Sequence, residues 1–156
     1  MPKLQEDFSK ISSSFEPLPE NADGYRMRLE EIEDQAANEE TVAALAAGEK
    51  QPALIFQSVV TEGECEDRAH WDYVYLKKKN GKPNRIGLGR VKAYAEAILG
   101  KERANAQEID TDELLKGEFL GVIKQRGYAD KTTGEQKLSS DLKKIFTESE
   151  YIHDLL

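Results

Sequence analysis

The chain has 156 residues, of which 38% are hydrophobic and 33% are charged, and its formal net charge is -8. A domain of about 150 residues buries enough surface to form its own core. Recurring aromatic and β-branched residues exclude a wholly disordered chain. No apolar run approaches the roughly 20 residues of a membrane span, and the N-terminus lacks the apolar stretch of a signal peptide. We therefore expect one folded domain in the cytoplasm, without a disulfide because Cys65 is the only cysteine.

Charge is distributed unevenly along the chain. Residues 1–72 contain 6 Lys or Arg and 17 Asp or Glu, whereas residues 73–92 contain 7 Lys or Arg and no acid. Attraction to phosphate is local, because salt screens charges separated by more than about 10 Å. The basic segment could therefore bind nucleic acid although the protein is acidic. A solvated lysine cluster would give the same pattern.

The predicted elements begin with a strand at residues 24–33, where apolar and charged residues alternate after an extended arm at residues 1–23. The Ala- and Glu-rich segment 34–51 is either a long loop or a loop that contains a short helix. A second, largely buried strand is expected at residues 52–63, which are rich in β-branched and apolar residues. The third strand begins at Trp71 and ends before the break NGKPN.

After this break the hydrophobic period changes from two to about 3.6. Apolar residues from Val91 to Leu99 have the spacing of one amphipathic helix, and Gly100 is placed to end it. Asp110 and Glu113 have the spacing of a capping box, which predicts a short second helix at residues 110–117.

Residues 119–128 and 136–146 are expected to form a hairpin of two strands around a loop that contains glycine. Leu138, Leu142 and Phe146 have the even spacing of a strand, although the apolar residues at positions 142, 145 and 146 also suit a helix. An acidic tail follows at residues 147–156.

Three strands, a helix and two more strands are the element order of the oligonucleotide/oligosaccharide-binding fold, or OB-fold. Other small α+β folds share this order. The sequence therefore predicts a mainly β domain over residues 24–146: a five-stranded OB-fold barrel with one helix and a short second helix between the third and fourth strands.

The third strand combines aromatic and basic residues. In an extended chain Trp71, Tyr73 and Tyr75 point to one face, and the alternate residues from Asp72 to Leu76 point to the other. If Val74 and Leu76 face the core, the aromatic rings are exposed about 6.5 to 7 Å apart. Each ring can then stack on a nucleobase, which contributes about 1 to 3 kcal/mol per base. The opposite orientation would place the rings in the core.

Basic residues follow the aromatic residues and recur between the fourth and fifth strands, and OB-folds bind ligands at both places. The predicted nucleic-acid contacts are Trp71, Tyr73, Tyr75, Lys77, Lys78, Lys79, Lys82, Arg85, Arg90, Lys92, Lys124, Arg126, Tyr128 and Lys131. An ordinary soluble hairpin would also explain the last four.

Several segments, spread over nearly the whole chain, resemble a family of small bacteriophage proteins that are thought to bind single-stranded DNA. They are DFSKISSSFEPLPENADGYRMRLEEIE, the Trp-Asp strand, RVKAYAEAILG, IDTDELLKGEFLGVIKQRGY and TGEQK. Separately, AHWDYVYLKKK is similar to the third strand of bacterial single-strand-binding proteins, in which the tryptophan stacks on bases. Asp72 departs from that pattern. The resemblance implies DNA binding during phage replication or recombination, in the cytoplasm of a host bacterium.

Residues that would indicate catalysis or a cofactor are scarce. Cys65, Asp67 and His70 lie close in sequence, but no second pair completes a zinc site, and a turn explains them. The GLG at residues 87–89 lacks the rest of a phosphate-binding loop. The sequence therefore predicts neither an enzyme nor a cofactor, although paired carboxylates leave a metal-dependent nuclease open.

The acidic tail is similar in character to the ends of single-strand-binding proteins, which recruit partner enzymes. Contacts with replication or recombination proteins are therefore expected at Tyr151, Ile152, Asp154, Leu155 and Leu156, unless a C-terminal helix packs this segment on the domain. The main alternative function is an acidic interaction module or DNA-mimicking inhibitor that uses residues 1–72. The sequence leaves homo-oligomers open.

Overall fold

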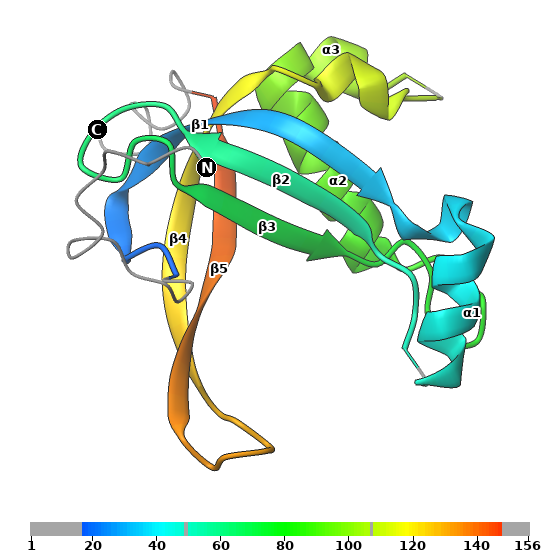
Figure 1. The fold of residues 1–156 in the computed structure, drawn as a ribbon. Coiled ribbons are helices and arrows are strands. Elements are labelled where there is room, and N and C mark those ends of the chain that lie inside the picture. Colours follow the sequence, from blue (N-terminus) through cyan, green and yellow to red (C-terminus); the bar gives the residue numbers. More distant parts are fainter. Residues whose placement is uncertain (1–16, 49, 107, 148–156) are drawn as a thin grey trace, which may run out of the picture.

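The computed structural model describes residues 17–48, 50–106 and 108–147 (Figure 1). The chain is mainly β, with a few helices. Its elements are β1 (Asn21–Asp34), η2 (Gln35–Ala37), α1 (Glu39–Ala47), β2 (Leu54–Val60), β3 (Ala69–Val74), α2 (Arg85–Leu99), α3 (Lys101–Ala104), η3 (Thr111–Leu114), β4 (Glu118–Ala129) and β5 (Gln136–Phe146). The tail residues predicted to bind partners lie outside the described residues.

The five strands form one antiparallel sheet in the order β3-β2-β1-β4-β5, with the long strand β1 in the centre. β4 and β5 continue beyond the other strands as a projecting hairpin (Figure 1). The edge strands β3 and β5 share no backbone ladder, so the sheet is not closed into a barrel. They are nevertheless neighbours, because Nε2 of His70 on β3 donates a hydrogen bond of 2.9 Å to the carbonyl oxygen of Ser140 on β5.

Helix α2 covers the inner face of the sheet and inserts Tyr94 into the core. This ring stacks on Phe56 with 4.3 Å between centroids, and it meets Phe119 edge to face at 5.3 Å. Aromatic pairs in these geometries stabilise a core beyond the area that they bury. The three rings come from α2, β2 and β4, so they fix the helix against strands on both sides of β1.

Helix boundaries follow local capping chemistry. The side chain of Asn84 accepts hydrogen bonds from the first-turn amides of Ile86 and Gly87, so α2 begins at Arg85, before the apolar periodicity that predicted it. The predicted capping box of Asp110 and Glu113 is present, but it starts a 3-10 turn and no α-helix. The sequence reading also missed α3, which follows Gly100 directly.

The first strand begins earlier than expected. β1 begins at Asn21, and Leu18 belongs to the core, so the described part of the predicted arm at residues 1–23 packs on the domain. The fifth strand and the helix α1 within segment 34–51 are both confirmed. Leu142 is buried as expected, whereas Leu138 is 55% exposed because it lies on the projecting hairpin.

Candidate nucleic-acid interface

The aromatic residues of β3 face outward. Trp71 is 42% exposed and Tyr73 is 58% exposed, whereas their neighbours His70 and Val74 are buried. The outward orientation of the rings is therefore confirmed, and the core alternative is wrong. Tyr75 is 41% exposed but follows the last residue of β3, so only two of the three rings stand on regular strand.

Asp72 points inward and has two partners on α2. The buried hydroxyl of Tyr94 donates a hydrogen bond of 2.8 Å to Oδ2 of Asp72, and Nε of Arg90 lies 3.7 Å from the same oxygen. Burial, followed by the negative charge of Asp72, raises the pKa of Tyr94 well above its usual value. The acid that departs from the bacterial pattern therefore connects β3 to α2 directly between the two exposed rings.

A tight basic loop connects β3 to α2. The amide of Lys78 donates to the carbonyl of Lys82 at 2.8 Å, and Lys77 forms a β-bridge with Pro83. Gly81 has φ of +82°, a conformation that glycine adopts without steric cost. The cations of this segment that are exposed are Lys77, Lys78, Lys79, Lys82, Arg85 and Lys92. The loop therefore presents positive charge at the end of the aromatic strand.

A groove of about 470 Å³ lies between the edge strands β3 and β5, and we call it the seam groove. Trp71 and Tyr73 line it from β3, Arg90 from α2, and Arg126 from β4. The groove therefore brings one cation of the predicted hairpin site next to the aromatic rings. Its remaining lining residues are His70, Asp72, Ser139, Ser140, Asp141, Leu142 and Lys143.

Sequence reasoning missed Asp141 and Lys143 as residues of this groove. Their alternate positions on β5 place them on one face, but only the approach of β5 to β3 brings that face beside Trp71. The other predicted hairpin contacts, Lys124, Tyr128 and Lys131, are exposed and do not line the groove.

Acidic residues border the aromatic face on its other side. Across the sheet, Trp71 on β3 is opposite Gln57 on β2, which is opposite Glu31 on β1. Tyr73 is likewise opposite Ile55 on β2, which is opposite Glu33 on β1. Two strand spacings of about 4.8 Å place these carboxylates roughly 10 Å from the rings. Segment 35–48, which contains α1, has no Lys or Arg. A polyanion is therefore favoured along β3 and the seam groove, and disfavoured across β1.

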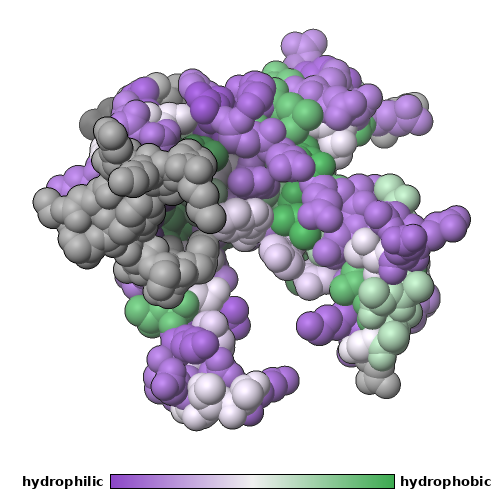
Figure 2. Space-filling view, in the orientation of Figure 1, coloured by the Kyte–Doolittle hydropathy of each residue, from purple (hydrophilic) through white to green (hydrophobic). Residues whose placement is uncertain are grey.

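The space-filling view shows a wide hollow between two projecting parts of the molecule, the β4–β5 hairpin and α1 (Figure 2). Hydrophilic and near-neutral residues cover the hairpin, the projection with α1 also shows hydrophobic residues, and near-neutral residues line part of the surface between them. The hollow leaves room for an extended ligand to approach this surface.

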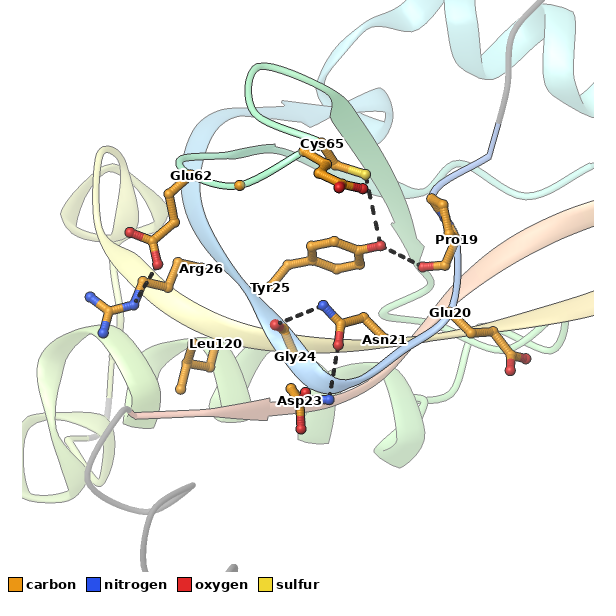
Figure 3. A pocket seen from close by; sticks show the side chains of 12 residues that line it. Pro19, Glu20, Asn21, Asp23, Gly24, Tyr25, Arg26, Glu62, Cys65 and Leu120 are labelled. Atoms are coloured by element: carbon orange, nitrogen blue, oxygen red, sulfur yellow. Dashed lines mark hydrogen bonds and ion pairs between the residues drawn. The ribbon is translucent and has the colours of Figure 1, made fainter.

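A second cavity of about 700 Å³ lies near the start of β1 and shares no lining residue with the seam groove (Figure 3). Four carboxylates line it, from Glu20, Asp23, Glu62 and Glu64. The hydroxyl of Tyr25 donates to the carbonyl of Pro19 at 2.7 Å. Burial, followed by the hydrogen bond with Cys65, raises the pKa of Tyr25 to about 12. This acidic cavity is unsuited to a phosphate ligand.

The histidine and cysteine near β3 have separate partners. Sγ of Cys65 lies 3.9 Å from the Tyr25 hydroxyl and accepts from Arg68, whereas His70 contacts Ser140. Among the described residues, no three His, Cys, Asp or Glu side chains converge as metal ligands would. No helix in the same part of the chain is long and apolar enough to cross a membrane.

Comparisons of the chain with protein-family models, curated proteins and solved structures find no significant match. The ligand class therefore has to be inferred from the geometry of the interface.

Proposed function

We propose that this protein binds single-stranded DNA, largely without regard to sequence, and acts in phage replication or recombination. The observation that carries the proposal is the seam groove, where two exposed aromatic rings lie beside two arginines. Exposed rings on a rigid strand combined with a positively charged groove are typical of proteins that bind single strands. The resemblance to small phage proteins supports the same class of ligand.

The proposed mechanism combines stacking with phosphate contacts. Unpaired bases stack on Trp71 and Tyr73, because every base has a π-face, and each contributes about 1 to 3 kcal/mol. The lysines of the basic loop, together with Lys143 in the groove, neutralise phosphates and release counterions. A duplex keeps its bases stacked on one another, so it cannot use the rings.

We also propose that the sheet is an OB-fold whose barrel is incompletely closed. Pairing of β3 with β5 would close the observed strand order into a five-stranded barrel. The contact between His70 and Ser140 supports this reading, because it joins the two strands that the closure requires.

A fluorescence titration with oligo(dT) tests the function, since Trp71 is the only tryptophan. We expect quenching on binding and an affinity that falls steeply with salt. Trp71→Ala and Tyr73→Ala, measured by anisotropy of a labelled strand, should each weaken binding about 5- to 150-fold, which corresponds to the stacking of one base. Leu138→Ala is the control, because this apolar residue is similarly exposed but lies outside the groove. An affinity for oligo(dT) too weak to measure at low salt would refute the proposal.

The acidic cavity favours a second candidate, a protein that imitates DNA and binds basic partners. Four carboxylates and one arginine, Arg26, line this cavity, which shares no residue with the seam groove, and Figure 3 labels three of the carboxylates, those of Glu20, Asp23 and Glu62. Such a protein would capture a DNA-binding enzyme and ignore oligonucleotides, so the same titration separates the two candidates.

A further inference from the structure

Two ion pairs lie in the seam groove beside the aromatic rings. Arg126 and Asp141 are diagonal neighbours in the β4–β5 ladder, where Arg126 is opposite Ser139, and 3.2 Å separates Nε of Arg126 from Oδ2 of Asp141. The pair of Arg90 and Asp72 is longer, at 3.7 Å. Nonspecific binding of a single strand needs cations and rings, and it does not need carboxylates among them.

The two pairs differ in their access to a ligand. The side chain of Asp72 is 13% exposed, and it already accepts a hydrogen bond from Tyr94. The side chain of Asp141 is 31% exposed, and that of Arg126 is 66% exposed. The distance of 3.2 Å is between Nε of Arg126 and Oδ2 of Asp141. A guanidinium carries five N–H donors and a carboxylate about four acceptor sites, so both groups retain capacity for a ligand.

A base that stacks on a ring of this groove presents its edge to the groove walls. Guanine has N1–H and N2–H donors side by side, with the O6 acceptor next to them, and a carboxylate beside a guanidinium complements that set. Adenine and cytosine each offer a carboxylate one amino group, and thymine offers one N–H between two acceptors. Thymine oxygens would also face the negative charge of Asp141.

We propose that Arg126 and Asp141 form a guanine-reading subsite within the single-strand interface. This inference rests on the proposed function, to which it adds a base preference at one position. The guanidinium donates to O6 while the carboxylate accepts from N1–H and N2–H. Exposed ion pairs contribute little to stability, so exchanging part of this pair for contacts with the base is not costly.

The test compares three strands: unmodified oligo(dT), oligo(dT) with scattered residues replaced by dG, and oligo(dT) with the same residues replaced by deoxyinosine. Deoxyinosine lacks the N2 amino group of dG. We expect the dG strand to bind the full-length chain about 10-fold more tightly than oligo(dT), since a bidentate contact discriminates by about that factor. The deoxyinosine strand should lose most of this gain. Equal affinities for the three strands would overturn the subsite and leave the proposed function standing, whereas failure to bind any of them would refute the function itself.

Asp141→Asn should abolish the dG preference while oligo(dT) affinity stays the same or increases, because a negative charge is removed from the groove. Asp130→Asn is the matched control, since Asp130 pairs with Lys137 at 2.8 Å on the same hairpin and does not line the groove. A dG preference that survives in Asp141→Asn would overturn the assignment. If this variant fails to fold, the comparison of the dG and deoxyinosine strands on the unchanged protein tests the guanine-reading subsite.

Discussion

Gly87 in the first turn of α2 packs directly on the backbone of Tyr75. A Cβ atom added at Gly87 would lie 1.8 Å from the carbonyl oxygen of Tyr75 and 2.7 Å from its carbonyl carbon. Separations below 3.0 Å do not occur at real Cβ atoms, so alanine here must move the start of the helix by more than 1 Å. Gly89, two residues further along the same helix, has open space around an added Cβ.

The two alanine variants should therefore change stability in opposite directions. Gly89→Ala should raise the free energy of unfolding by up to about 1 kcal/mol, because alanine is the better helix former. Gly87→Ala gains the same propensity, but it pays about 1 to 3 kcal/mol for overpacking and about 1 kcal/mol for a disturbed Asn84 cap. The variants should differ by roughly 2 to 4 kcal/mol in the free energy of unfolding.

Urea denaturation followed by circular dichroism measures this difference. A separate titration should show weaker oligo(dT) binding by Gly87→Ala alone, because the displaced helix carries Tyr75 and the basic loop with it. Equal unfolding midpoints for the two variants would refute the close approach of α2 to the backbone of Tyr75.

Three further predictions concern the basic loop, the Tyr25 hydroxyl and the acidic tail. Lys78→Glu combined with Lys79→Glu should weaken oligo(dT) binding and flatten its salt dependence, and an unchanged slope would remove these lysines from the phosphate path. The pKa of Tyr25, raised from 10.0 to about 12, means that the native state holds this proton more tightly, so stability should fall between pH 10 and pH 12. Tyr25→Phe should lessen that fall in alkaline melting experiments, and an identical pH profile would contradict the shift. Truncation after Phe146, which removes residues 147–156, should leave the melting temperature unchanged, tighten oligo(dT) binding at low salt and abolish capture of replication or recombination proteins. A large drop in melting temperature would show instead that the tail packs on the domain.

Local patterns in the sequence were sufficient to predict most helices and strands, and to predict that the aromatic rings of β3 face outward. Alternation along residues 71–74 identified the outward rings, because successive side chains of a strand point to opposite faces. The spacing of Asp110 and Glu113 identified their capping box, since both hydrogen bonds are made within one turn. These features depend on residues only a few positions apart, so they can be read without the fold.

The tertiary structure alone decided which distant residues share a surface. Arg126 and Asp141 lie beside Trp71 because the open sheet bends until its two edge strands meet. That bend depends on strand twist and on register shifts, such as the one between Leu29 and Glu31, and it accumulates over the whole sheet. The sequence showed Asp72 as an exception to a pattern, but its partners Tyr94 and Arg90 come from a helix whose position only the packed core sets.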